Sequence, residues 1–163
     1  MTGFAALLAG AEALGDGLSL EVPGTWHQGR TAYGGFSSAL ALAVAQRVGG
    51  DTLPPLRSAQ LAMMAPVAGQ VTATARIERQ GRNATWISAA IHGDKGIAFT
   101  ASFVFMGAVR SALHINRRPV PDGLIAPADA RAVGYTGVTP AFLQNHFACR
   151  HALPLGDAPR PEL

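Results

Sequence analysis

Cysteine and charged residues are both scarce in this sequence of 163 residues. Cys149 is the only cysteine, which excludes a disulfide within the chain and a cysteine metal cluster. A chain of this kind suits a reducing compartment, so we expect a cytoplasmic protein. Charged residues make up 14% and hydrophobic residues 48%, so much of the surface must be uncharged or covered by a partner. We therefore expect a homo-oligomer.

Signals for nucleic-acid, metal and dinucleotide binding are also missing. The net charge is +3, and no stretch interleaves basic with aromatic residues as a nucleic-acid surface would. The histidines show no metal-ligand spacing, and there is no phosphate loop or dinucleotide fingerprint. We expect no metal, no cofactor and no nucleic-acid partner.

No hydrophobic run reaches the ~20 residues that a bilayer span needs, so we expect no membrane segment. The Ala/Leu run from Phe4 to Leu14 resembles a signal-peptide core in composition. However, no basic residue precedes it, and Glu12 and Asp16 interrupt or closely follow it. We predict a short amphipathic helix there.

The most informative segment is an apolar helix over residues 36–48. Gly34-Gly35 opens this segment and Gly49-Gly50 ends it. Its only polar residues are Ser37, Ser38, Gln46 and Arg47. A surface helix would carry a charged face, so this helix must be enclosed by a sheet or a subunit interface.

Strand patterns surround this helix. Apolar and polar residues alternate from Leu18 to Val22, before the helix. Four more strand segments follow the helix, joined by short turns, at Leu56 to Met64, Val71 to Glu78, Thr85 to His92 and Ile97 to Met106. This order predicts an α+β fold in which an antiparallel meander packs one face on the helix.

The pattern changes beyond Gly107, where seven of the eleven prolines lie. We predict a first domain over residues 1–108 and, over 109–163, a Pro-rich linker with a possible first strand of a second domain. Within it we expect one helical turn near Ala128 to Ala132 and an apolar patch, Phe142 to Phe147, that docks elsewhere.

Several stretches together resemble the acyl-CoA thioesterase II-like family. They are Gly29 to Gly35, Leu56 to Val67, Gly81-Arg82 and Pro140 to Asn145. The resemblance implies a hotdog fold, an antiparallel sheet wrapped around a central helix. Family members usually carry two hotdog repeats, and this sequence resembles the first repeat, the linker and the opening strand of the second. Two interpretations fit this: a piece of a longer chain, or a short form.

The resemblance implies hydrolysis of an acyl-CoA to the free acid and CoA. Gly34 and Gly35 suit this chemistry, because free N–H groups at a helix start can hold a developing oxyanion. In the two-repeat family the catalytic Asp, Thr and Gln lie in the second repeat. The matching places here hold residues such as Gln60 and Thr85, and no carboxylate.

The remaining candidate residues follow from position. His27 precedes the glycine turn and Ser37 lies in the first helical turn, so both are candidate catalytic groups. We predict Tyr33, Gln60 and Thr85 as substrate-binding residues, and Arg57, Arg79 or, preferably, Arg82 as the contact for the CoA phosphates.

Two alternative functions stay open. One is a catalytically silent hotdog that binds acyl-CoA or completes a dimer, and the other is an acyl-thioester hydratase or dehydratase. The missing carboxylate on the helix motivates the first. The second requires an Asp close to a His such as His27.

Overall fold

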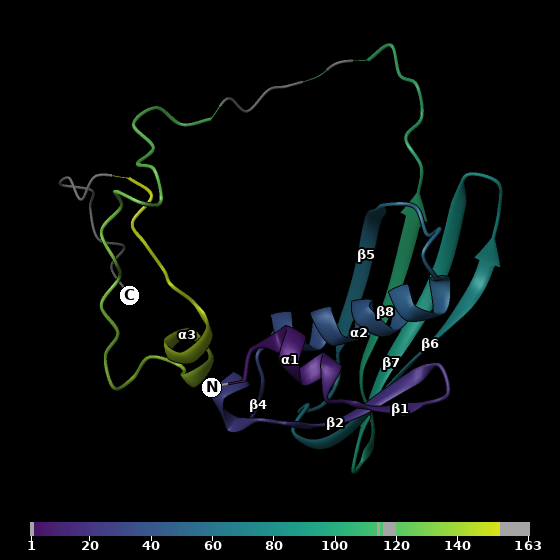
Figure 1. The fold of residues 1–163 in the computed structure, drawn as a ribbon, viewed down its shortest axis with the longest axis horizontal. Helices are drawn as coiled ribbons and strands as arrows, with labels where there is room; N and C mark the ends of the chain where they lie inside the picture. The colour runs from purple at the N-terminus through teal and green to yellow at the C-terminus, as the bar shows by residue number, and fades with distance from the viewer. Residues whose placement is uncertain (1, 114, 116–119, 154–163) are drawn as a thin grey trace.

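A computed structural model describes residues 2–113, 115 and 120–153. Its main feature is a six-stranded antiparallel sheet in the order β1-β2-β6-β7-β8-β5, with helix α2 against one face (Figure 1). The strands of this sheet are β1 (Glu12–Leu14), β2 (Gly17–Val22), β5 (Leu56–Met63), β6 (Gly69–Gln80), β7 (Ala84–Gly93) and β8 (Gly96–Met106). The predicted α+β class, an antiparallel sheet around a central helix, is confirmed.

The remaining elements lie around the start of α2 (Gly34–Gly49). They are helix α1 (Phe4–Ala9), the 3-10 helix η1 (Gly24–Trp26), the paired strands β3 (His27–Gln28) and β4 (Thr31–Ala32), and helix α3 (Ala141–His146). The described part of the chain contains no helix that is long and apolar enough to cross a membrane.

The core lies between α2 and the inner face of the sheet. Leu40, Ala41, Val44 and Ala45 of α2 are completely buried. Alternate residues of β7 and β8 meet them, and Ile87, Ile91, Phe99, Phe103 and Phe105 are likewise buried. On another side of α2, the Phe4 ring of α1 contacts the Phe36 ring edge-on, with 5.4 Å between centroids. This enclosure explains why α2 has almost no polar face.

The predicted four-strand meander is wrong in one respect. Strands β6, β7 and β8 form a meander, but β5 pairs with β8 and not with β6, so that Met63 lies opposite Phe99. The segment after β5, where a tight hairpin turn was expected, is a crossover held by hydrogen bonds from the N–H groups of Met64 and Ala65 to the Ala98 carbonyl. Strand β5 therefore lies at an edge of the sheet.

Two shorter segments also differ from expectation. Helix α1 ends at Ala9, and Glu12 to Leu14, expected to be helical, forms strand β1 in a hairpin with β2. Gly15 in that hairpin has a φ of +60°, which glycine adopts without strain. The turn after Leu14 therefore determines the structure of Glu12 to Leu14, although the Ala/Leu composition favours a helix.

Beyond β8 the chain returns to the N-terminal segment that precedes α2, where α3 packs on η1 and β3 (Figure 1). A turn closed by a bond from the Ala130 N–H to the Ala126 carbonyl lies just before the helical turn expected near Ala128 to Ala132, and Ala132 itself is extended. The expected opening strand is reduced, among the described residues, to an isolated bridge between Ala132 and Arg150. The division into 1–108 and 109–163 stays a prediction.

Candidate functional site

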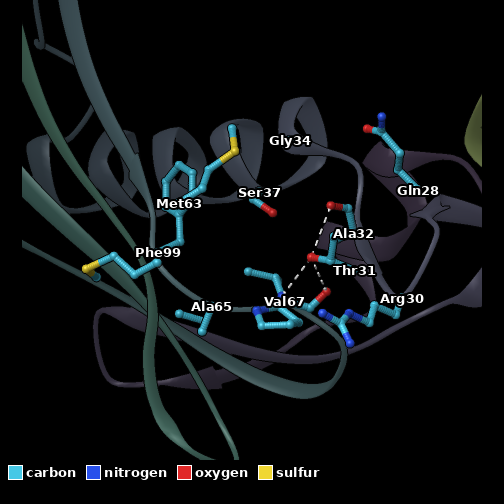
Figure 2. A pocket seen from close by; sticks show the side chains of 13 residues that line it. Gln28, Arg30, Thr31, Ala32, Gly34, Ser37, Met63, Ala65, Val67 and Phe99 are labelled. Carbon is cyan, nitrogen blue, oxygen red and sulfur yellow. Dashed lines mark hydrogen bonds between the residues drawn. The ribbon is translucent and has the colours of Figure 1, made fainter.

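A cavity of about 350 Å³ lies beside the first turn of α2 (Figure 2). Four parts of the chain form it: the β3–β4 hairpin, the start of α2, the crossover after β5, and the start of β8. Its lining residues are Gln28, Arg30, Thr31, Ala32, Gly34, Ser37, Met63, Met64, Ala65, Pro66, Val67, Ala98 and Phe99. Two of the stretches that carry the family resemblance, 29–35 and 56–67, therefore meet at one site.

Hydrogen bonds between β4 and the crossover form one wall of this cavity. The Ala32 N–H donates to the Val67 carbonyl at 2.6 Å, and the Val67 N–H donates to Thr31 Oγ1 at 2.9 Å. Thr31, Val67 and Met63 were not among the site residues predicted from the sequence. The only available signal was their place in the two resembling stretches, since nothing in one sequence pairs residues 31 and 67.

The first turn of α2 presents free backbone donors next to the cavity. The Tyr33 carbonyl accepts hydrogen bonds from the N–H groups of Phe36 (2.9 Å) and Ser37 (3.3 Å). The Gly34 and Gly35 N–H groups precede these donors, and the first N–H groups of a helix have no partner inside it. Together with the positive end of a 16-residue helix, they can stabilise a negative charge.

Both glycines are also sites of close packing. A Cβ on Gly34 would lie 2.7 Å from Met63 Cε, and a Cβ on Gly35 would overlap the ring of Tyr33. Gly34 lines the cavity directly, whereas Gly35 lies under the Tyr33 ring.

Ser37 is buried, and its hydroxyl points into the cavity (Figure 2). The next residue, Ser38, instead donates to the Gly34 carbonyl at 2.8 Å, one turn back in the helix. The hydrogen bonds of the described residues leave the Ser37 hydroxyl free. It is therefore available to a bound group.

Acid–base groups are missing from this cavity. Among the described residues that line it, Arg30 is the only charged one, and no carboxylate, imidazole or thiol is present. General-base catalysis needs such a group near the substrate. The cavity is therefore suited to binding and polarising a carbonyl, but it contains no base.

The two other candidates at this end, His27 and Tyr33, lie beside the cavity without lining it. His27 Nε2 is buried and has no hydrogen-bond partner among the described residues. The Tyr33 ring stacks on Phe142 of α3, with 4.2 Å between centroids and 3° between planes. The expected docking of the Phe142 to Phe147 patch thus occurs on Tyr33.

A second stack holds the other end of α3. His146 lies parallel to Trp26, with centroids 3.7 Å apart, and its Nε2 lies 3.1 Å from Thr25 Oγ1. Burial lowers the pKa of His146 below its usual value. Helix α3 thus contacts the segment that leads into α2 at two points.

The remaining predicted substrate residues lie away from this cavity. The glycine turn lies at the Phe99 end of β8, because Gly34 is close to Met63, which is opposite Phe99. Arg82 lies at the other end of β8, in the turn before Ala84, which is opposite Met106. Phe99 and Met106 are seven steps apart along β8, or about 23 Å at 3.3 Å per residue.

Three further candidates also lie outside this cavity. Arg57 is near the same distal end and donates from Nε to the Met106 carbonyl at 3.0 Å. Thr85 is buried on the helix side of β7, opposite Phe105, and Gln60 is exposed in the middle of β5. A single chain therefore does not bring these residues to the glycine turn.

Comparison with known proteins identifies this architecture. The model of the acyl-CoA thioesterase N-terminal domain matches residues 22–106. No sequence among curated proteins matches. The chain resembles a crystal structure of a conserved protein with hotdog fold from Alicyclobacillus acidocaldarius, with 19% identity and a TM-score of 0.72 over 88% of this chain and 53% of that one.

Two further structures extend the likeness. One is the TesB protein of Mycobacterium avium subspecies paratuberculosis, with 19% identity and a TM-score of 0.60 over 78% of this chain and 49% of that one. The other is a Bacillus halodurans protein crystallised with CoA, with 17% identity and a TM-score of 0.55 over 63% of this chain and 73% of that one. This chain spans about half the length of the Alicyclobacillus and Mycobacterium proteins. The family model covers more than half of the sequence, so the chain belongs to the acyl-CoA thioesterase N-terminal domain family and has its hotdog fold.

Proposed function

We propose that this chain is the N-terminal hotdog of an acyl-CoA thioesterase, which binds the thioester while a second hotdog supplies the general base. The observation that carries this proposal is the composition of the cavity. Free N–H groups and the Ser37 hydroxyl meet there, and no titratable base lies among the described residues that line it.

The proposed reaction divides between the two hotdogs. A water attacks the thioester carbonyl carbon while a base on the second hotdog takes its proton. The developing oxyanion accepts hydrogen bonds from the Gly34 and Gly35 N–H groups. The C–S bond then breaks, and the CoA thiolate leaves and takes up a proton. The Ser37 hydroxyl donates a hydrogen bond to the bound thioester.

The edge strand β5 is the proposed contact for the second hotdog. All eight residues of β5 are exposed, and only one side of the strand is paired, with β8. Leu61 and Met63 lie on the helix side of the sheet and are 41% and 66% exposed. An unpaired, apolar edge strand readily pairs with another strand.

Antiparallel pairing through β5 would also bring the distal arginines of one hotdog close to the glycine turn of the other. In such a pair, the Leu56 end of one β5 lies beside the Met63 end of the other. Arg57 and Arg82 of one hotdog then approach the cavity of its neighbour. Their guanidinium groups can form bidentate contacts with the CoA phosphates. A CoA-bound structure of the Bacillus halodurans protein supports CoA as the ligand of this fold.

The test compares binding with turnover for the chain by itself. Binding of a panel of acyl-CoAs is measured by calorimetry, and hydrolysis by release of free thiol. We expect acyl-CoA to bind more tightly than CoA, with no turnover. Absence of any acyl-CoA binding would refute the proposal. Turnover by this chain by itself would show that the base lies within it, and would assign the complete reaction to the single hotdog.

A further inference from the structure

A second cavity lies on the outer face of the sheet, at the end distant from the glycine turn. Its volume is about 670 Å³, and its lining residues are Glu78, Arg79, Gly81, Arg82, Asn83, Ala84, Trp86 and Ser102. Trp86 is 39% exposed, although tryptophan is usually well covered. This cavity shares no lining residue with the one beside α2.

An irregularity in β6 determines which charge lies beside the indole. Ile77 is opposite Ile87 on the helix side, and regular alternation would then place Glu78 opposite Trp86. The register shifts between Ile77 and Arg79, so that Arg79 is opposite Trp86 instead. Directly opposed residues share a face of the sheet. The bulge therefore places a guanidinium group, and not a carboxylate, across from the exposed indole.

The one carboxylate in this cavity is already engaged. Glu78 Oε1 accepts hydrogen bonds from Arg76 Nε at 2.8 Å and from the Ser88 hydroxyl. These contacts lower the pKa of Glu78, the Ser88 hydrogen bond most strongly. Within the described residues, the Arg76–Glu78 pair is the only salt bridge. Arg79 and Arg82 thus have no carboxylate partner there.

Positive charge extends around the same end of the sheet. Arg82 and Asn83 also line an adjacent cavity of about 360 Å³, together with Arg110. Arg57 is anchored nearby through the Met106 carbonyl. Guanidinium groups bind phosphate oxygens in a bidentate manner. This end of the sheet is therefore suited to a ligand with more than one phosphate oxygen.

We propose that this cavity binds a nucleotide, with the base on Trp86 and the phosphates on Arg79 and Arg82. Base–aromatic stacking and guanidinium–phosphate contacts are the two interactions that such a ligand needs, and Asn83 adds an amide for the base edge. The cavity offers a single indole, which suits one base and not a run of stacked bases. The CoA case of this inference rests on the proposed function, which already assigns Arg82 to the CoA phosphates, whereas a free nucleotide would bind independently of it.

Two kinds of ligand contain both a base and phosphates: the nucleotide end of a CoA molecule, and a free adenine nucleotide. Adenosine 3′,5′-bisphosphate is the probe, because it contains the nucleotide end of CoA without pantetheine. It is titrated into the full chain while tryptophan fluorescence is recorded. Trp26 and Trp86 are the only tryptophans, and Trp26 is buried. We expect saturable quenching that persists in Trp26→Phe and disappears in Trp86→Phe.

Arginine variants test the phosphate contacts by calorimetry. The double variant Arg79→Gln/Arg82→Gln should weaken binding of the probe by more than about tenfold, because each lost charged hydrogen bond costs about that factor. Arg131→Gln removes the same charge from an exposed position outside the cavity and should leave binding unchanged. All three arginines are exposed, so the substitutions should not alter the fold, which a melting curve checks.

Titrations with other ligands show whether the site binds CoA or a free nucleotide, and which results would contradict the proposal. Binding of CoA and the bisphosphate, with ADP more than about tenfold weaker, assigns the site to CoA, whereas equal binding of ADP assigns it to a free nucleotide. Both outcomes support a nucleotide site. Three results would overturn it: no saturable quenching at millimolar probe, equal affinity for inorganic phosphate, or no effect of the arginine substitutions.

Discussion

Gly34 and Gly35 are adjacent at the start of α2, yet a side chain would meet different neighbours at the two positions. On Gly34 it would meet the terminal methyl of Met63, a flexible side chain that is 66% exposed. On Gly35 it would meet the aromatic ring of Tyr33, which Phe142 holds by stacking.

We predict that Gly35→Ala destabilises the protein by about 1–3 kcal/mol, the usual cost of overpacking. Gly34→Ala should change the free energy of unfolding by less than about 1 kcal/mol, because Met63 can move and alanine favours a helix. Denaturant unfolding of the two variants measures the difference. Equal destabilisation of both would contradict this account of the Tyr33 ring.

A serine pair provides a matched test of the cavity. We predict that Ser37→Ala weakens acyl-CoA binding by about two- to tenfold, the value of one neutral hydrogen bond. Ser38→Ala should leave binding unchanged, since its hydroxyl is used by the Gly34 carbonyl. Calorimetry with one acyl-CoA compares them. Unchanged binding in Ser37→Ala would show that the Ser37 hydroxyl does not contact the ligand.

For single residues of the site, the sequence predicted those that follow from a local pattern. It missed those whose role depends on contacts with residues far away in the sequence. Gly34 and Ser37 were accessible because a glycine pair opens an obvious helix. Thr31 was missed because its role is a hydrogen bond to Val67, 36 residues away. Arg57 and Arg82 were predicted as contacts for the CoA phosphates, and the strand register places them at the end of the sheet far from the glycine turn, which a single sequence does not reveal.

Among the elements, α3 lies next to the site without lining the cavity. Its two aromatic stacks connect it to Trp26 and Tyr33, and Phe142 is 7% exposed. We predict that Phe142→Ala releases α3 without unfolding the sheet. Hydrogen exchange should then rise in residues 25–36 and stay low in β7 and β8. Unchanged exchange in 25–36 would show that α3 does not hold this segment.

The docking of α3 should also depend on pH through His146. Burial favours the neutral imidazole, so its pKa in the docked state lies below the usual 6.5. The undocked state binds a proton more readily, so docking is stable above pH 6.5 and weakens as the pH falls below it. Trp26 emission, measured in a Trp86→Phe background, should change between pH 7.5 and 5.5.

A substitution that keeps the stack provides the control for this pH dependence. His146→Phe retains an aromatic ring against Trp26 and removes the titrating group. The pH response of Trp26 emission should disappear in this variant. A persistent response would assign it to another group.

The strand order illustrates what a pattern of alternation can and cannot predict. The alternation in β6, β7 and β8 correctly gave three strands. It also gave β5 as a strand, but alternation contains no information about partners. The crossover through Ala65 and Val67 is stabilised by backbone bonds to Ala98 and Ala32, and these have no sequence signature.

For the whole molecule, the exposed edge strand predicts the assembly. We expect the chain to associate through β5, so Leu61→Glu should shift it toward the monomer in analytical ultracentrifugation, because a charge cannot be buried in that contact without cost. Leu113→Glu, at a residue that is 78% exposed outside the sheet, should leave the mass unchanged. The reverse result would place the contact outside β5.

The stack between Tyr33 and Phe142 also has a consequence for how the protein is made. It joins residues more than one hundred positions apart, so it forms only after nearly all of the described chain has been synthesised. The sheet and α2 use residues up to Met106 and can assemble while later residues are still inside the ribosome. The contact of α3 with Tyr33 and Trp26 is therefore the last of these contacts to form, and a nascent chain passes through a stage in which Trp26 and Tyr33 are uncovered.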